Sequence, residues 1–247
     1  MAHDTVECNG HRIDAQPFRD ALVYWGRHNF RPYPWRTTQD PYQILIAEVM
    51  LHRTQAKQVV PIYLRFIERF PNARQLSHAH ASELHEMLHS LGLRWRIDLI
   101  RDMGSELVRQ FDGQVPHERD ELVSLPGVSD YIASAVRCFA WNLPEPLIDT
   151  NTVRVVGRLF GLPTSPSSRR TRRFRRLITS LLDPVEPRAY NFALLDLAGT
   201  VCKSRPRPMC EHCPVASWCQ HGQKVVLAGC STRDNPRMCS QAQPGML

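Results

Sequence analysis

The chain has 247 residues, of which 43% are hydrophobic, and it carries a formal net charge of +7. This length supports one large or two small domains with a proper core. No apolar run reaches the roughly 18 residues of a membrane span, and the N-terminal segment lacks the basic and apolar regions of a signal peptide. These features exclude a membrane protein, and we expect a cytoplasmic one.

Positive charge is concentrated in two segments, RRTRRFRR (169–176) and CKSRPRP (202–208). An excess of arginine suits a polyanionic partner such as nucleic acid. A solvated basic helix face or a coding bias toward arginine explains the same pattern, because lysine occurs only at positions 57, 203 and 224. Composition alone leaves these interpretations open.

Helical periodicity dominates the sequence, and no run alternates convincingly as a strand does. We therefore predict an all-α fold. Residues 1–15 are expected to form a short N-terminal extension, and residues 223–247 a flexible tail. In chain order, the expected helices cover residues 16–29, 41–55, 57–70, 81–90, 94–111, 118–124, 130–140, 151–160, 169–182 and 187–198.

Residues 44–51, ILIAEVML, place a single acid within an apolar run. On a helix, Glu48 shares one face with Ile44 and Leu51, so its carboxylate points toward a core or a cleft. Burying a carboxylate is costly unless it is hydrogen-bonded, paired or protonated. A structural ion pair and a functional acid that faces a pocket are the two interpretations.

Four of the eight cysteines lie close together in CKSRPRPMCEHCPVASWC, at Cys202, Cys210, Cys213 and Cys219. In a reducing compartment this spacing is more typical of a metal or cluster site than of two disulfides. Zinc and a [4Fe–4S] cluster both accept four cysteine ligands. The spacing alone favours zinc, because zinc is the commoner of the two.

The segment ELVSLPGVSDYIASAV (121–136) predicts a helix, a tight turn at Pro126-Gly127 and a second helix that Ser129 begins. Backbone N–H groups in such a turn can hold a phosphate without reading sequence. A plain corner between two helices is the alternative.

Asp149 directly precedes another helix, where an N-cap acid contributes about 1 kcal/mol to helix stability.

Together these segments resemble the helix-hairpin-helix DNA glycosylases that carry an iron–sulfur cluster, the superfamily of endonuclease III and of the mismatch adenine and thymine glycosylases. The resemblance covers about residues 30–220. It rests on the four cysteines in the family's order and on YPWR (33–36), AEVMLHRTQ (47–55), LPGV (125–128) and IDTNTVRV (148–155).

The resemblance implies two helical domains with the active-site cleft between them. Residues 40–160 would form a six-helix barrel that contains the helix-hairpin-helix motif. Residues 16–39 and 161–222 would form the iron–sulfur cluster domain. The resemblance also implies that Cys202, Cys210, Cys213 and Cys219 hold a [4Fe–4S] cluster rather than zinc.

The implied activity is base excision, in which the enzyme flips one nucleotide out of a duplex and cleaves its N-glycosidic bond. Asp149 would be the catalytic carboxylate that stabilises the cationic sugar, and Glu48 would lie in the pocket for the flipped base. Tyr131 stands where endonuclease III has the lysine that forms a Schiff base, so we expect a monofunctional enzyme that leaves an abasic site.

Tyr131 and LHRT (51–54) make the chain similar to the Mig-type thymine glycosylases, which act on G:T and G:U mismatches. The expected partner is double-stranded DNA with a mismatched or damaged base, bound by a monomer associated with the nucleoid. Trp95 is expected in the core, with insertion between bases as its alternative role. The residues expected to contact DNA are His52, Arg53, Gly127, Ser129, Lys203, Arg205 and Arg207.

Two alternatives remain open. An adenine glycosylase that acts on A opposite G or 8-oxoguanine shares Glu48, but only 28 residues follow Cys219, too few for its C-terminal reader domain. A non-catalytic DNA-binding protein would use the hairpin and cluster only as clamps and would need neither Glu48 nor Asp149. The chain also departs from the family pattern at Asp130 in the hairpin and by one extra residue in the first cysteine spacing.

Overall fold

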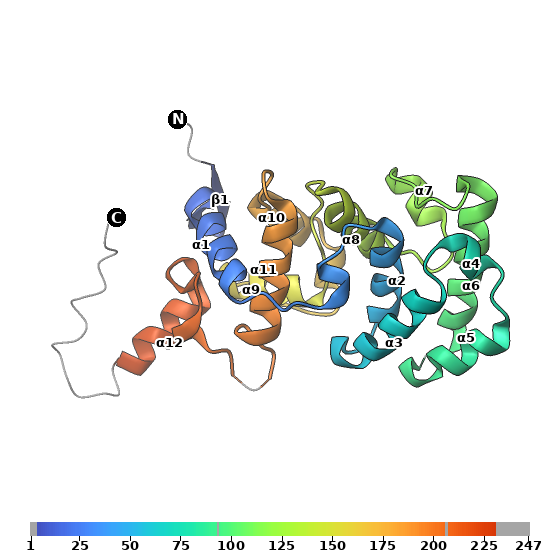
Figure 1. Ribbon diagram of the computed structural model, residues 1–247. Helices are drawn as coiled ribbons and strands as arrows, with labels where there is room; N and C mark the ends of the chain where they lie inside the picture. Colours follow the sequence, from blue (N-terminus) through green and yellow to red (C-terminus); the bar gives the residue numbers. More distant parts are fainter. Residues whose placement is uncertain (1–3, 93, 206, 231–247) are drawn as a thin grey trace. The chain divides into compact units, whose positions relative to one another are not determined.

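The computed structural model describes residues 4–92, 94–205 and 207–230, without the side chains of residues 94 and 226–230. The chain divides into two compact units (Figure 1). Unit 1 contains Met1–Asn29, Ile148–Leu181 and Phe192–Leu247, and unit 2 contains Phe30–Leu147 and Leu182–Asn191. The sequence grouped residues 30–39 and 182–191 with most of unit 1 and residues 148–160 with most of unit 2, so the boundaries differ at these three segments.

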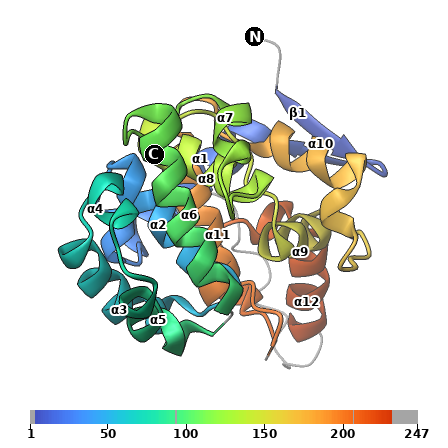
Figure 2. The same ribbon diagram turned by 90° about the vertical axis from the view of Figure 1, so that its right-hand side faces the viewer.

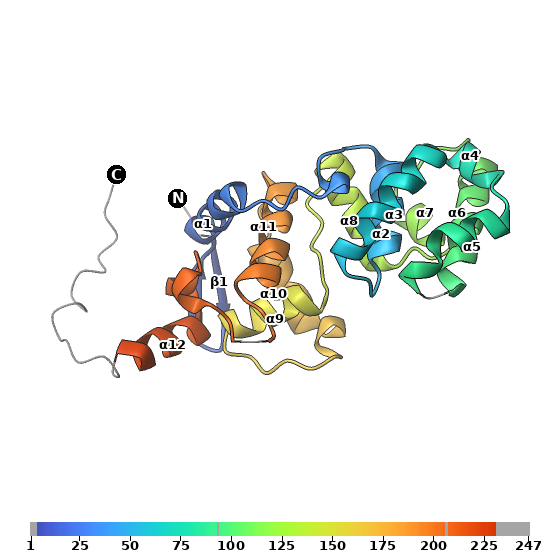
Figure 3. The same ribbon diagram turned by 60° about the horizontal axis from the view of Figure 1, so that its bottom comes forward.

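Unit 2 is built from helices (Figure 3). In this unit α2 contacts α3 and α8, while α6 contacts α4 and α5. The side chains between these helices are largely aliphatic and aromatic, which gives the unit its own core. Its elements are η1 (Pro34–Arg36), α2 (Pro41–Leu51), α3 (Ala56–Arg69), α4 (Ala73–Ser77), α5 (Ala81–Leu88), η2 (His89–Leu91), α6 (Arg94–Phe111), α7 (Arg119–Ser124) and α8 (Asp130–Trp141).

Helix α2 ends at Leu51, whereas the sequence predicted an end at residue 55. Arg96 of α6 explains the difference, since its side chain donates hydrogen bonds to the carbonyl oxygen of Met50, at 2.6 Å, and to that of His52. Arg96 is only 2% exposed. Because this partner comes from far along the chain, the local sequence does not reveal where the helix stops.

Unit 1 combines a two-stranded antiparallel hairpin with helices. Strand β1 lies beside α10 (Figure 2), and α9 contacts both α10 and α12. Helix α11 (Pro187–Thr200) crosses the boundary between the units. The elements of unit 1 are β1 (Thr5–Cys8), β2 (His11–Asp14), α1 (Ala15–His28), α9 (Thr150–Leu159), η3 (Ser168–Arg170), α10 (Arg172–Leu181), η4 (Cys210–His212), η5 (Ala216–Trp218) and α12 (Gln220–Cys230).

The hairpin at residues 5–14 contradicts the prediction of a chain without strands. Its turn is Asn9-Gly10, with φ angles of 54° and 75°, the left-handed conformations that a two-residue type I′ turn requires. Alternate side chains on the strands point inward, with Val6 5% exposed and Ile13 fully buried. The fold is nevertheless predominantly helical, as predicted.

Most predicted helices are confirmed, and α1, α3, α6, α7, α8, α9 and α11 begin and end within two residues of the expected positions. The short helix α4 was not predicted, although Asn72 caps it by accepting a hydrogen bond from the Gln75 N–H. Residues 223–230 are helical in α12 rather than part of a flexible tail, and residues 231–247 lie outside the described part. Among the helices that are described, none is long and apolar enough to cross a membrane.

Candidate active site and nucleic-acid interface

Asp149 begins α9, and hydrogen bonds hold both of its carboxylate oxygens. Oδ1 accepts from the backbone N–H groups of Asn151, at 2.9 Å, and Thr152, at 2.7 Å, while Oδ2 accepts from Asn151 Nδ2 at 2.7 Å. The backbone N–H of Asp149 donates to Thr152 Oγ1 at 3.0 Å, which completes a capping box. The carboxylate is therefore fixed in one orientation at the positive end of a helix dipole.

Arg154 connects this cap to the segment that carries the cysteines. Its Nη1 donates to Asn151 Oδ1 at 3.1 Å. Its Nε and Nη2 donate to the carbonyl oxygens of Cys202, at 3.0 Å, and Ala198, at 2.9 Å. Burial lowers the pKa of Arg154, but the normal pKa of arginine is so high that the side chain stays charged. One guanidinium thus ties the partner of Asp149 to the backbone at Cys202.

The cysteine segment is folded around Arg158. Arg158 Nη1 lies 3.2 Å from Cys202 Sγ, and the thiol of Cys219 donates to the Arg158 carbonyl oxygen at 3.4 Å. The N–H of Cys213 donates to the carbonyl oxygen of Cys210 at 3.2 Å, so a tight turn joins these two residues. Arg158 therefore lies next to the first and last cysteines of the motif.

The four thiols are near enough to influence one another. Burial raises the pKa of Cys213 to about 12; the N–H of Val215 opposes this shift, and the thiols of Cys202, Cys219 and Cys210 add to it. Four cysteine thiols are a donor set that a metal centre accepts, and they would lose their protons on binding the metal. However, the structure as described for residues 4–230 contains no group of three or more His, Cys, Asp or Glu side chains placed to hold a metal ion.

Glu48 is buried in the middle of α2, and only 7% of its surface is exposed. Seven other residues of this helix, all apolar or aromatic, are buried as well. Helix α2 contacts α8, which carries the half-buried Tyr131 in its first turn. The burial predicted for Glu48 is confirmed, while the roles of Glu48 and Tyr131 stay predictions.

Helices α7 and α8 form a helix-hairpin-helix through residues 125–129. Gly127 has φ 80°, a left-handed conformation that favours glycine, and Ser129 Oγ accepts a hydrogen bond from the Ile132 N–H at 3.4 Å. The side chain of Asp130 is 81% exposed and lies 3.7 Å from Arg119. An acid beside a phosphate would repel it, and Arg119 partly neutralises the charge of Asp130.

A half-buried carboxylate, Glu145, connects the two helices of this hairpin. Glu145, whose side chain is 13% exposed, forms ion pairs with Arg119 of α7 and, at 2.6 Å, with Arg137 of α8. Arg119 also donates to Ser134 Oγ at 2.7 Å. Because Glu145 joins one arginine from each helix, it holds α7 against α8 and sets the shape of the turn between them.

The turn after α2 presents exposed polar side chains. Both His52 and Arg53 are exposed, and Arg53 has φ 60°. Trp95, expected in the core, is 49% exposed, and its ring meets the His52 ring edge-on with 6.1 Å between centroids. Its neighbour Arg96 occupies the buried position instead. An exposed aromatic ring and two polar side chains therefore lie together at this turn.

The loop between Cys202 and Cys210 carries the other residues predicted to contact DNA. The N–H of Met209 donates to the carbonyl oxygen of Val201 at 3.0 Å, which closes the loop at its base. Lys203 is half-buried, whereas Arg205 and Arg207 are exposed. The loop therefore displays cations next to the cysteine segment.

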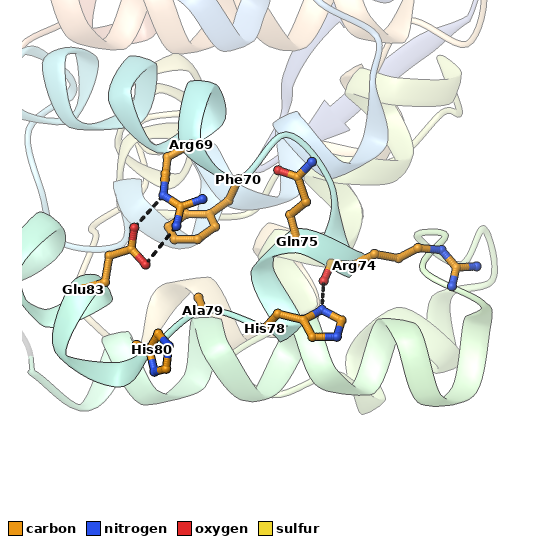
Figure 4. A pocket seen from close by; sticks show the side chains of 8 residues that line it. All are labelled: Arg69, Phe70, Arg74, Gln75, His78, Ala79, His80 and Glu83. Carbon is orange, nitrogen blue, oxygen red and sulfur yellow. Dashed lines mark hydrogen bonds and ion pairs between the residues drawn. The ribbon is translucent and has the colours of Figure 1, made fainter.

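Unit 2 also contains a pocket of about 450 Å³ at α3, α4 and α5 (Figure 4). Arg69 pairs with Glu83 there, at 2.5 and 3.3 Å, and His78 Nδ1 bonds with the Arg74 carbonyl oxygen at 2.7 Å. Arg74 itself pairs with Asp112. None of the predicted site residues lines this pocket, and its arginines are neutralised by acids, so we assign it no chemistry.

The predicted site residues divide between the two units. Unit 1 holds Asp149, the four cysteines, Lys203, Arg205 and Arg207, and unit 2 holds Glu48, His52, Arg53, Gly127, Ser129 and Tyr131. Sequence reasoning missed three arginines that position them, namely Arg96, Arg154 and Arg158. Each binds carbonyl groups at least 44 residues away, so local patterns give no signal.

Residues 46–180 match the HhH-GPD superfamily base excision DNA repair protein family. A thymine/uracil-DNA glycosylase of Pyrobaculum aerophilum is 40% identical over 83% of this chain and 91% of that protein. An adenine DNA glycosylase of Rattus norvegicus is 32% identical over 86% of this chain, which covers 43% of that protein. The structure of a thermostable thymine-DNA glycosylase superposes with a TM-score of 0.78 and 29% identity, covering 85% of this chain and 97% of that one. The chain belongs to the HhH-GPD superfamily of base excision DNA repair proteins.

Proposed function

We propose that this protein is a monofunctional DNA glycosylase that removes thymine or uracil from G:T and G:U mismatches and leaves an abasic site. The observation that carries the substrate assignment is the 40% identity to a thymine/uracil-DNA glycosylase, which extends over 83% of this chain. Adenine opposite G or 8-oxoguanine is the second candidate substrate, because adenine glycosylases are also relatives.

Asp149 is assigned as the catalytic carboxylate. When the N-glycosidic bond breaks, positive charge develops on the sugar, and a negative charge stabilises that transition state more than the neutral substrate. The hydrogen bonds from Asn151 and Thr152 hold the carboxylate in place before the reaction, so little reorganisation is needed.

Tyr131 is assigned to the flipped nucleotide but not to covalent catalysis. A phenol cannot form the Schiff base through which a lysine would cut the strand, so hydrolysis should stop at the abasic site. Glu48 is assigned to the base, because a buried carboxyl group can hydrogen-bond a flipped base on its pairing edge or position a water. Neither role requires sequence-specific contacts to the surrounding duplex.

The exposed polar groups are assigned to the DNA backbone and to the helix gap left by the flipped base. Gly127 and Ser129 form the hairpin turn, whose backbone N–H groups suit a phosphate. His52 and Arg53 lie together in the turn beside the exposed Trp95. Lys203, Arg205 and Arg207 add positive charge. We expect a monomer that associates with the nucleoid through these contacts.

The four cysteines are assigned as ligands of a [4Fe–4S] cluster. Cys202, Cys210, Cys213 and Cys219 supply the four thiolates that such a cluster takes. When bound, the cluster would supply a cross-link that holds the loop between the first two cysteines. Arg158 and Arg154 would keep that loop attached to α9 through their hydrogen bonds to the Cys202 carbonyl oxygen.

Strand cleavage on duplexes with one G:U or G:T pair tests this proposal. Nicks should form only after alkali treatment, and borohydride should trap no covalent complex, because Tyr131 supplies no amine. The Tyr131→Lys variant, with an amine at the same position, should give a borohydride-trapped complex. Nicking without alkali by the wild-type protein would contradict the monofunctional assignment, and no base release from any duplex would contradict the glycosylase itself.

A further inference from the structure

The segment 169–176 is strongly basic. The helix α10 is amphipathic, and Phe174 and Leu177 are buried on its inner side. Its packing against α9 and β1 therefore holds the outer side in place. All the arginines of this segment are exposed, and we call them the arginine surface: Arg169, Arg170, Arg172, Arg173, Arg175 and Arg176.

The arginine surface accounts for nearly all the net charge of the protein. The chain has 31 Lys and Arg residues against 24 Asp and Glu residues. Segment 169–176 has six arginines and no acid, which leaves 25 basic and 24 acidic residues in the rest of the chain. The remainder is thus almost neutral, and the basic character of this protein is a local feature.

These arginines differ in pairing from three exposed arginines of unit 2. Arg69, Arg74 and Arg109 each form an ion pair with a nearby acid. In the part of the chain that the structure describes, no ion pair involves any member of the arginine surface. A set of adjacent, unneutralised guanidinium groups repel one another, so an anionic partner would stabilise them.

The arginine surface borders a hollow beside the N-terminal hairpin. This pocket, of about 550 Å³, is lined by Glu7, Cys8, Asn9, Arg172, Arg173 and Arg176. Arg173 Nη2 donates to Asn9 Oδ1 at 2.5 Å and to Cys8 Sγ at 3.1 Å, so the hairpin orients this guanidinium. The carboxylate of Glu7 pairs with Arg12 at 2.7 Å. The pocket is therefore basic and large enough for a phosphate group.

We propose that the arginine surface binds the phosphate backbone of duplex DNA, as a contact additional to the hairpin turn. Protein interfaces are centred on buried aromatic or aliphatic side chains. Segment 169–176 has one large apolar side chain, Phe174, and it is buried in the core. Guanidinium groups without apolar neighbours suit phosphates, which they bind through paired hydrogen bonds without reading sequence.

The test compares two variants that lose the same charge. Arg172→Gln/Arg176→Gln removes two exposed arginines that line the pocket, and Arg69→Gln/Arg109→Gln removes two exposed arginines that are paired with acids. Glutamine is a good helix former, so both proteins should melt like the wild type. The affinity of each for an undamaged duplex is measured between about 50 and 200 mM salt, the range over which phosphate contacts weaken strongly.

The first variant should lower the slope of log affinity against log salt by about 2, since each lost phosphate contact removes about 0.9. The second variant should keep the wild-type slope. Equal slopes for all three proteins would overturn the inference and leave an acidic protein as the partner to seek. Equal losses in both variants would also overturn it, because net charge rather than position would then decide affinity.

The inference rests on the proposed function, but the two fail differently. At saturating enzyme, the single-turnover rate of base release by Arg172→Gln/Arg176→Gln should equal the wild-type rate, because neither arginine belongs to the assigned catalytic residues. Wild-type base release with unchanged salt slopes would refute the arginine surface alone. Absence of base release by the wild type would refute the glycosylase function, whatever the slopes show.

Discussion

The regions around Asp40 and Asp149 begin helices in the same way. In both, the carboxylate accepts hydrogen bonds from the backbone N–H groups of the second and third residues that follow. In both, a side-chain amide also reaches the second oxygen: Gln43 Nε2 at 3.1 Å from Asp40 and Asn151 Nδ2 at 2.7 Å from Asp149. Both aspartates are half-buried. The geometry of a cap therefore cannot by itself identify a catalytic acid.

The two caps differ in what supports them. Thr152 completes a capping box with Asp149. Arg154 donates hydrogen bonds to the Asn151 side chain and to the Cys202 carbonyl oxygen. No capping box is present at Asp40. A cap that only stabilises its helix does not need these additional hydrogen bonds. We infer from this difference that Asp149 keeps its orientation for a purpose beyond helix capping.

The largest effect is expected for Asp149→Asn. Asparagine caps a helix as well as aspartate does, so the thermal stability should be close to that of the wild type. The loss of the negative charge should lower the single-turnover rate of base release by about 10³-fold, because an electrostatic contact made in the transition state is lost. DNA affinity, measured on an undamaged duplex, should not fall.

Asp40→Asn is the matched control for this variant. It makes the same chemical change at a cap of the same geometry, so its rate of base release should equal that of the wild type. If both variants lost activity to the same extent, the effect would come from helix capping, and Asp149 would not be catalytic. If neither variant lost activity, Asp149 would not be the catalytic carboxylate.

A second acid, Glu48, lies on the helix that Asp40 begins. Glu48→Gln keeps the shape and hydrogen-bonding capacity of the side chain, and it should lower the rate of base release by about 10²-fold, at the low end for a group that moves or orients a proton. Glu68→Gln, on the exposed side of α3, is the control. Normal turnover by Glu48→Gln would make the buried acid structural.

The C-terminal end of α2 is held by Arg96 of α6, whose guanidinium binds backbone carbonyl groups there. Arg96→Met should lower the free energy of unfolding by about 1–3 kcal/mol, because buried carbonyl groups lose their donor. It should also weaken DNA binding, since the turn with His52 and Arg53 loses its support. Arg101→Met, on the same helix and paired with Asp102 at the surface, should cost less than about 1 kcal/mol.

The smallest effect is expected from the capping box itself. Thr152→Ala removes the hydroxyl that accepts from the Asp149 N–H, and it should lower the free energy of unfolding by about 1 kcal/mol. The rate of base release should fall modestly, and Thr152→Ser should restore it. Gln43→Ala, at the corresponding position beside Asp40, should leave the rate unchanged. A rate unaffected in Thr152→Ala would show that the box serves only the helix.

Much of the helical framework was predictable because its signals are local. Asp40 followed by Pro41, Ser129 after a Pro-Gly turn and Asp149 before a periodic segment all marked helices that the structure confirms. The apolar run around Glu48 also predicted its burial correctly. In each case the residues that determine the feature are adjacent in sequence, so one short segment contains the whole cause.

The failures have two causes. The hairpin at residues 5–14 carried a local signal, Asn9-Gly10 between alternating residues, that the strong helical pattern elsewhere obscured. The end of α2 had no local signal, because Arg96, which binds its last backbone carbonyls, lies more than 40 residues away. Side-chain contacts over such distances cannot be inferred from periodicity.

This protein should release a pyrimidine that is mispaired with guanine. The most direct measurement identifies the base released, by mass, from duplexes of one sequence that contain a single G:T, G:U or 8-oxoguanine:A pair. We predict release of thymine and uracil and no release of adenine. Release of adenine alone would contradict the substrate assignment and make Glu48 the proton donor to a purine.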